Sequence, residues 1–173
     1  VSLINDILRL SQLDEGGALP HEQVSVLELA QEAARSLTAQ AAAQAVHISV
    51  TGTAGTVFGV RRLLYEIARN LCENAVKYNV PGGSVTVEVA ETDRDVALLV
   101  RDTGIGIPEG DQSRVFERFY RVDKSHSRAI GGTGLGLSIV KHAVAYHHGT
   151  LRLESQPGKG TVITVTLPKE PTE

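Results

Sequence analysis

Hydrophobic residues along the chain recur with two spacings, one typical of helices and one typical of strands. Apolar positions three and four residues apart predict α-helices over residues 26–37, 60–77 and 135–147. Alternating or uniformly apolar runs predict strands over residues 46–50, 85–89, 96–100, 151–153 and 163–167. The run at 96–100 is apolar throughout, so we expect it to be buried on both faces or nearly so. The pattern predicts an α+β fold with helices on one face of a mixed sheet.

A further helical pattern runs from Val1 to Asp14, and half of its positions are apolar. So wide an apolar stripe favours a piece of a helical bundle, and packing of this helix on its own domain is the alternative. Gly16 and Gly17 end the pattern, and Pro20 indicates a linker. The chain therefore divides into a helical segment, a linker, a main domain and a tail: residues 1–17, 18–23, 24–168 and 169–173.

Composition and charge narrow the class of protein. The chain has 173 residues, of which 42% are hydrophobic and 21% charged, as expected of a soluble protein that buries a core. Its net charge of −3 gives no general attraction to nucleic acid. No apolar run approaches the ~18 residues of a membrane span, and no secretion signal is visible. Because the chain starts with Val1 and contains no Met, we expect a soluble, cytoplasmic fragment of a longer protein, which is either cytoplasmic or a sensor of the inner or plasma membrane.

One long segment lacks regular structure. A stretch of about 25 residues after Pro108 has little periodic pattern, and loops of that length in compact domains are usually functional lids or disordered. A glycine-rich block over 131–136 follows and leads into the third helix. Free amides and the positive end of the helix dipole make such a helix start a phosphate site. A hinge for the preceding loop is the alternative, and the two roles are compatible.

The predicted helix over residues 60–77 carries two asparagines and a lysine beside its apolar face. At ~100° per residue, Asn70, Asn74 and Lys77 share one ridge. The same projection is expected to turn three charged residues to the opposite side: Glu66, Arg69 and Glu73. Carboxamide oxygens suit Mg²⁺, and a lysine neutralises phosphate. Hydrogen bonds from the asparagines to neighbouring backbone are the alternative.

A carboxylate and two glycines follow the buried strand. Asp102 ends that strand, where a carboxylate needs a hydrogen-bonding or charged partner. Gly104 and Gly106 permit a close approach of the backbone to a flat ligand. An acidic acceptor beside such backbone suits the exocyclic amine of a purine. An ordinary Asp-Thr-Gly turn is the alternative. The one cysteine, Cys72, excludes an internal disulfide and is expected in the core.

Taken together, five blocks occur in the order found in one family: residues 70–78, 102–108, 116–121, 132–137 and 158–161. They resemble the N, G1, F, G2 and G3 boxes of sensor histidine kinases, within the gyrase, chaperone and mismatch-repair ATPase superfamily. The resemblance covers roughly residues 24–168 and implies a two-layer α/β sandwich, the Bergerat fold. It also implies three main helices on one face of a mixed sheet and a long ATP lid.

The resemblance implies ATP and Mg²⁺ as ligands and assigns roles by position. It makes Asn74 the Mg²⁺ ligand, supported by Asn70, and brings Arg121 of the lid to the γ-phosphate. The residues assigned to catalysis are Asn70, Lys77 and Arg121. Those assigned to the nucleotide are Asn74, Lys77, Tyr78, Asp102, Gly104, Gly106, Ile107, Gly132, Thr133, Gly134, Leu135, Gly136, Leu137 and Thr161. Among these, Asp102 takes the adenine amine.

One position separates kinases from ATPases in this superfamily. Members that hydrolyse ATP tend to carry a Glu four residues before the metal-binding Asn, and here that position is Asn70. Glu73 is expected to point away from the nucleotide. The resemblance therefore implies phosphoryl transfer to a protein histidine. An ATP-driven clamp of the gyrase or mismatch-repair kind and an inactive nucleotide-binding module are the alternatives.

The remaining implications concern the acceptor and partners. Residues 1–17 resemble the second helix of the dimerisation and phosphotransfer hairpin, and none of the six histidines matches the acceptor motif. We therefore expect the acceptor histidine on a phosphotransfer domain outside this chain, a homodimeric whole protein and a response-regulator receiver domain as partner. Nucleic acid is not expected as a partner.

Two features at helix ends carry smaller expectations. Val60 stands where the family usually has an Asp that caps the following helix, so we expect a cap weaker by up to ~1 kcal/mol. The His147-His148-Gly149 sequence is not expected to bind metal. An imidazole placed favourably at the end of a helix is the expected role.

Overall fold

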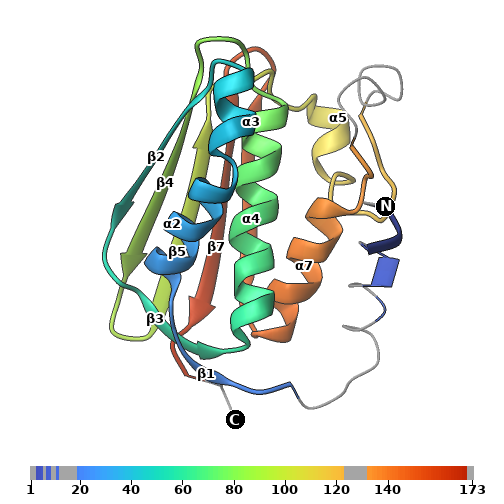
Figure 1. Ribbon diagram of the computed structural model, residues 1–173. Coiled ribbons are helices and arrows are strands. Elements are labelled where there is room, and N and C mark those ends of the chain that lie inside the picture. Colours follow the sequence, from blue (N-terminus) through green and yellow to red (C-terminus); the bar gives the residue numbers. More distant parts are fainter. Residues whose placement is uncertain (1–2, 6, 9–10, 12–18, 123–131, 171–173) are drawn as a thin grey trace.

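A computed structural model shows the chain as two layers, with helices over one face of a sheet (Figure 1). It describes residues 3–5, 7–8, 11, 19–122 and 132–170. The helical layer consists of α2 (Val26–Ser36), α3 (Thr38–Ala43), α4 (Arg61–Lys77) and α7 (Gly136–Tyr146). A short helix, α5 (Glu109–Gln112), begins the lid. Residues 123–131 of the predicted lid, which include His126, lie outside the described residues.

The main sheet has five strands in the order β2-β4-β5-β7-β6. Their bounds are β2 (His47–Gly52), β4 (Ser84–Glu91), β5 (Asp95–Asp102), β6 (Thr150–Gln156) and β7 (Gly160–Pro168). β2 runs parallel to β4, and the other neighbouring strands are antiparallel. The predicted α+β class with a mixed sheet is therefore confirmed. The antiparallel register pairs Asp102 with Thr161, which brings the end of β5 next to the start of β7.

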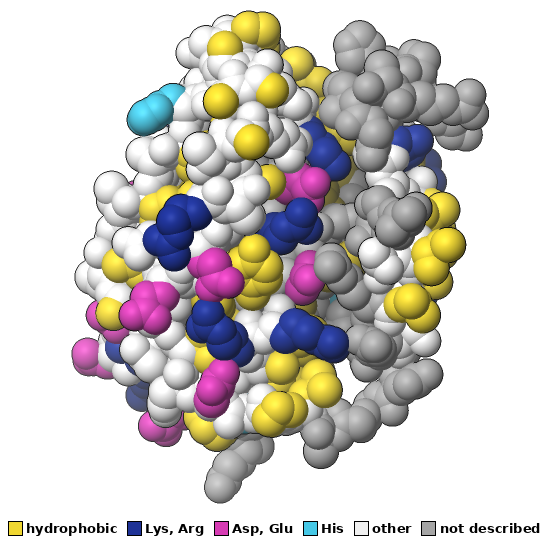
Figure 2. Space-filling view, viewed as in Figure 1, with side chains coloured by type: hydrophobic (Ala, Val, Ile, Leu, Met, Phe, Trp, Pro, Cys, Tyr) yellow, Lys and Arg dark blue, Asp and Glu magenta, His cyan; other side chains and the backbone are white. Residues whose placement is uncertain are grey.

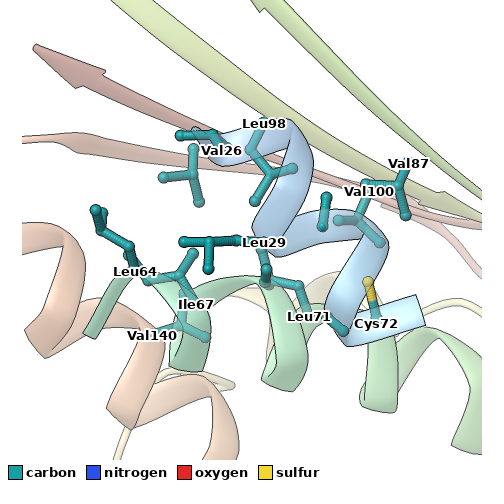
Figure 3. Close-up of a cluster of buried hydrophobic side chains, with 14 of the residues drawn as sticks. Val26, Leu29, Leu64, Ile67, Leu71, Cys72, Val87, Leu98, Val100 and Val140 are labelled. Carbon is teal, nitrogen blue, oxygen red and sulfur yellow. The ribbon is translucent and has the colours of Figure 1, made fainter. Parts of the chain in front are cut away.

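The core lies between the two layers and is built from alternate strand residues and the apolar faces of the helices. Figure 3 shows side chains of α2 and α4 meeting those of β4 and β5. Leu29 and Ile67 are each 1% exposed. Cys72 is completely buried in this core, as expected, and burial raises the pKa of its thiol to about 12. A neutral thiol in such a place acts as a small apolar side chain.

The prediction that residues 96–100 are buried on both faces or nearly so holds fully for one face only. Val96, Leu98 and Val100 are buried, whereas Ala97 and Leu99 are only half-buried. The reason is that the described helices cover one face of the sheet, so on the other face the side chains of this central strand are flanked by their cross-strand neighbours. An all-apolar run therefore does not require a layer on each side.

Short elements account for the other differences from the expected pattern. α2 ends one residue before its expected bound at 37, and α3, which was not predicted, follows as a separate helix. β3 (Thr56–Gly59) pairs with β1 (Glu22–Ser25) in a small second sheet, and β3 was not predicted. Four-residue strands are too short to show a period. The start of α2 agrees with the sequence, since the Glu28 N–H donates to Ser25 Oγ over 3.3 Å.

The N-terminal helix is only partly described. Residues 3–5, 7–8 and 11 are helical, and the rest of the predicted 1–17 segment lies outside the described residues. Leu3, Ile4, Ile7 and Leu8 all appear among the exposed large apolar side chains, with Ile4 64% exposed. Among the described helices, none has the length and apolar character needed to cross a membrane.

The start of α4 is supported by a residue from another helix. Val60 has no side-chain cap to offer, as expected, but its N–H donates to His147 Nε2 over 3.0 Å. The Nδ1–H of His147 in turn donates to the Ala143 carbonyl over 2.7 Å. Gly59 leaves room for the ring, because a Cβ there would lie 2.7 Å from His147 Nε2. The imidazole does sit at a helix end, but it is a neutral acceptor rather than a cation on the helix dipole.

We expect the stability of the fold to decrease as the pH falls below about 6.5, the ordinary pKa of histidine. Burial lowers the pKa of His147, so in this range the unfolded chain binds the proton more readily than the folded one. Neighbouring His21 and His148 act in the same direction. Urea unfolding at pH 7.5 and 5.5 measures the effect.

The matched variants are His147→Gln and His148→Gln, because His148 is exposed and its ring accepts no backbone N–H from α4. His147→Gln should be less stable at pH 7.5 and should show a smaller loss on acidification than the wild type. His148→Gln should keep most of the wild-type loss. An equal loss in the wild type and in His147→Gln would show that His147 is not the titrating group.

Candidate functional site

A cavity of about 620 Å³ lies between α4, the end of β5 and the described ends of the lid. The predicted site residues that line it are Asn70, Asn74, Lys77, Tyr78, Asp102, Gly106, Ile107, Arg121, Gly132, Thr133, Gly134, Gly136, Leu137 and Thr161. Gly104 and Leu135 are not part of its lining. Five separate sequence blocks thus border one concave site of the size that holds a small ligand.

The asparagines of α4 point their oxygens toward the start of α7. Asn70 Nδ2 donates to the Glu66 carbonyl over 2.8 Å and to Glu66 Oε2 over 3.1 Å, so its Oδ1 is turned the other way. A Cβ added at Gly136 would lie 3.1 Å from Asn70 Oδ1 and 3.9 Å from Asn74 Oδ1. The two oxygens therefore converge on one place. Neutral hard oxygens, completed by phosphate and water, are a donor set that suits Mg²⁺.

The expected direction of the charged residues on α4 is wrong. Arg69 and Glu73 line the cavity, and Glu66 contacts Asn70. Residues four apart are separated by only about 40° around a helix, so Glu73 shares a face with Lys77, as Glu66 does with Asn70. Glu73 is paired with two cations, Lys77 Nζ at 3.3 Å and Arg69 Nη1 at 3.6 Å. Glu73 therefore faces the cavity, but its carboxylate is paired with two cations and is not free.

Asp102 presents a carboxylate that is partly fixed by backbone amides. Its Oδ1 accepts from the Gly104 N–H over 2.9 Å and from the Thr161 N–H over 3.2 Å. Burial raises the pKa of Asp102, and these two hydrogen bonds act in the opposite direction. Within the described part of the chain, Oδ2 accepts no hydrogen bond. One oxygen thus holds the loop and the other is left for a donor in the cavity.

The glycines after Asp102 serve the protein's own backbone. A Cβ at Gly104 would lie 2.2 Å from the Tyr78 carbonyl, and one at Gly106, where φ is 70°, would lie 2.1 Å from the Gln156 carbonyl. The Ile105 N–H also donates to the Tyr78 carbonyl over 3.0 Å. These glycines let the loop pack against the end of α4 and the β6–β7 turn. Only Gly106 of the two borders the cavity.

The ends of the lid meet at the glycine block. A Cβ at Gly132 would lie 3.0 Å from Tyr78 Oη and 3.4 Å from Arg121 Nη2, so a phenol and a guanidinium converge there. The Phe119 N–H donates to the Gly134 carbonyl over 2.9 Å, which ties the two ends of the lid together. Leu135 is completely buried against Ile139 and anchors the block instead of lining the cavity.

Sequence reasoning missed several residues of the site. The apolar part of the lining comes from residues that look like ordinary core or loop positions: Leu71, Val100, Pro108, Val115, Pro157 and Ile163. Tyr120 also lines the cavity; its hydroxyl donates to Asp111, and Arg114 lies 4.4 Å from its ring. Asn5 of the N-terminal segment reaches the lining as well. Three of these residues carried a signal, since Leu71, Pro108 and Tyr120 lie within the blocks at 70–78, 102–108 and 116–121.

The chain is similar to a known family and to several known proteins. The family of histidine kinase-, DNA gyrase B-, and HSP90-like ATPases matches residues 59–171. The sensor-like histidine kinase SenX3 of Mycolicibacterium smegmatis is 42% identical over 173 residues, which cover 98% of this chain and 44% of the relative. The sensor histidine kinase WalK of Bacillus subtilis is 49% identical over 105 residues, 60% of this chain and 17% of the relative. The chain thus spans less than half the length of these relatives.

Solved structures show the same fold. The mycobacterial sensor histidine kinase MprB aligns with a TM-score of 0.76 at 33% identity, covering 88% of this chain and 100% of that one. Full-length ShkA in complex with AMPPNP aligns with a TM-score of 0.83 at 27% identity, covering 96% of this chain and 35% of that one. The predicted two-layer Bergerat sandwich is confirmed. The chain belongs to the family of histidine kinase-, DNA gyrase B-, and HSP90-like ATPases.

Proposed function

We propose that this chain is the catalytic ATP-binding domain of a two-component sensor histidine kinase. It transfers the γ-phosphoryl group of ATP to a histidine on a phosphotransfer domain outside this chain. The observation that carries the proposal is one cavity that is bordered both by the Asp102 carboxylate and by the converging oxygens of Asn70 and Asn74. An acceptor for a base amine and a cation site for phosphates are the two requirements of an ATP pocket.

ATP binding follows from these groups. Asp102 Oδ2 accepts the adenine amine, and Ile107 and Thr161 border the base. The amides of residues 132–137, at the start of α7, hold the phosphates, as helix starts do. Asn74 and Asn70 hold Mg²⁺, which neutralises charge on the phosphates when it is bound. The similarity to ShkA, whose structure contains the nucleotide analogue AMPPNP, supports this placement.

Catalysis in such a site consists mostly of positioning and charge stabilisation. Lys77 and Arg121 line the cavity and supply two positive charges. Lys77 now pairs with Glu73, so a phosphate would compete with that carboxylate for it. Hydrolysis needs a carboxylate that activates water. The position expected for it holds Asn70, and the nearby carboxylate of Glu73 is already shared by two cations.

The acceptor histidine lies elsewhere under this proposal. No histidine is found among the described residues that line the cavity. His147 is buried and bonded to two backbone groups, and His142 Nε2 lies 3.3 Å from the Arg118 guanidinium. Both histidines therefore have partners outside the cavity in which the phosphates are proposed to bind.

The domain plan and partners complete the proposal. Residues 1–17 are the second helix of a dimerisation and phosphotransfer hairpin, which accounts for the exposed apolar side chains of Leu3, Ile4, Ile7 and Leu8. Residues 18–23 are the linker, 24–168 the catalytic domain and 169–173 a tail. The whole protein is a homodimer that passes the phosphoryl group to a receiver domain, and this domain works in the cytoplasm. Figure 2 shows acidic and basic side chains interspersed over the helical layer, not a basic patch for nucleic acid.

Radiolabelled phosphoryl transfer tests the function. The chain is incubated with Mg²⁺, ATP labelled at the γ-phosphate and a separately produced histidine phosphotransfer domain of a sensor kinase. We expect acid-labile label on that domain, no label on this chain and no label on an acceptor whose histidine is replaced by Gln. Label on any of the six histidines of this chain, or release of phosphate without transfer, would contradict the proposal.

A further inference from the structure

Glu66 is a carboxylate buried on α4, one helical turn before Asn70. It is only 8% exposed, although a buried charge is costly unless it is hydrogen-bonded. Its Oε2 accepts from Asn70 Nδ2 over 3.1 Å. Glu66 does not itself line the cavity, whereas Asn70 does. Its carboxylate therefore lies behind a residue of the site.

The contact decides which way the Asn70 carboxamide faces. The Nδ2 group has two acceptors in front of it, the carbonyl and Oε2 of Glu66, at 2.8 and 3.1 Å. Turning the carboxamide over would place Oδ1 against those two oxygens, which repel it and would leave Nδ2 without them. Asn70 Oδ1 is therefore held toward Gly136 and Asn74 Oδ1.

Orientation matters because only one end of a carboxamide binds a cation. The oxygen is a Mg²⁺ ligand, and the amino group is a donor that repels the ion. Without the Glu66 carboxylate, the backbone carbonyl of residue 66 would be the one remaining acceptor for Asn70 Nδ2. The carboxamide would then be held less firmly in one orientation and could rotate to the other. A second partner behind a ligand commonly affects metal affinity by about 10- to 100-fold.

We infer that Glu66 is a positioning residue for the metal end of the cavity: it fixes the Asn70 carboxamide with its oxygen toward Mg²⁺. This role rests on the proposed function, since it requires Mg²⁺·ATP in the cavity. It adds to the assigned ligands a residue that touches neither metal nor nucleotide. Asn70 is thereby pre-oriented before the ligand arrives.

The test compares Glu66→Ala with Glu66→Gln. Gln has the same length and keeps a carbonyl oxygen that accepts from Asn70, so it should rescue what Ala loses. Glu32→Ala is the matched control, because Glu32 is an exposed carboxylate on α2 that pairs with Arg61 of α4 over 2.8 Å. Each variant is titrated with ATP by calorimetry, once with Mg²⁺ and once with EDTA.

We expect Glu66→Ala to lower the affinity for ATP about tenfold with Mg²⁺ and to leave the affinity with EDTA unchanged. Glu66→Gln and Glu32→Ala should stay within about twofold of the wild type under both conditions. In NMR spectra without nucleotide, the Asn70 side-chain amide proton that bonds to Glu66 Oε2 should keep a downfield shift in the wild type and in Glu66→Gln. In Glu66→Ala it should move upfield, because it loses that acceptor.

Two results would overturn the inference alone: a Glu66→Ala variant with unchanged affinity in Mg²⁺, or one in which affinity falls equally with Mg²⁺ and with EDTA. The second result would mean a general structural role. A wild-type chain that binds no ATP, or binds it equally with and without Mg²⁺, would instead overturn the proposed function, and the role of Glu66 with it.

Discussion

Replacing Asp102 with Ala should lower the affinity for ATP roughly 10- to 100-fold, the range expected for a hydrogen bond to a charged group in a half-buried site. The variant removes the acceptor for the adenine amine. It also removes the Oδ1 atom that holds the Gly104 and Thr161 N–H groups. Calorimetric titration with ATP and Mg²⁺ measures the loss.

Asp102→Asn separates these two contributions. An Asn oxygen can still accept from Gly104 and Thr161, which leaves the amino group facing the cavity. The variant should therefore keep its fold and lose affinity for ATP. It should gain affinity for inosine triphosphate, whose base carries a carbonyl in place of the amine. If both variants bound ATP with the wild-type affinity, Asp102 would not be the acceptor for the adenine amine.

Replacing Asn74 with Ala should have the second large effect, a loss of roughly 100-fold or more in the rate of phosphoryl transfer to a supplied phosphotransfer domain. The variant removes one of the two carboxamide oxygens that converge near Gly136. Most of the loss in rate should come from weaker binding of Mg²⁺. The affinity for ATP should therefore fall with Mg²⁺ present and change little in EDTA.

Asn74→Asp is the control for this prediction. A carboxylate also binds Mg²⁺, so the variant should keep a metal-dependent affinity for ATP. Its negative charge near the phosphates should nevertheless slow the transfer. If Asn74→Ala transferred the phosphoryl group at the wild-type rate, Asn74 would not be the metal ligand.

Much of this architecture can be predicted from the sequence because long elements show a clear period. α4 and α7 begin and end within a residue or two of their expected bounds. The block at 102–108 could be associated with a ligand because a carboxylate and two glycines follow an apolar strand. The resemblance also assigned the separate blocks to one nucleotide site, which periodicity alone does not do.

The remaining features depend on contacts between distant segments. The Val60 N–H finds its acceptor in His147, 87 residues away, and no local pattern indicates that pairing. Gly104 packs against the Tyr78 carbonyl, which belongs to a different block. The central strand is covered by the described helices on one face, although its residues 96–100 are all apolar.

Helix geometry accounts for the most consequential correction. Glu66 and Glu73 do not point away from the ridge of Asn70, Asn74 and Lys77, because a spacing of four residues keeps side chains on one face. Two other observations favour a kinase over an ATPase. Asn70 stands at the position of the expected base, and Glu73 is paired with Arg69 and Lys77.

The most direct test of the central claim is an NMR titration of the ¹⁵N-labelled chain with ATP and Mg²⁺, which locates the bound nucleotide residue by residue. We predict saturation at one ATP per chain, with the largest shifts at Asn74, Asp102 and Gly134. His21 and Phe58, which border a separate and smaller pocket, should not shift. Saturable shifts confined to that second pocket, or no saturable shifts at all, would contradict the account.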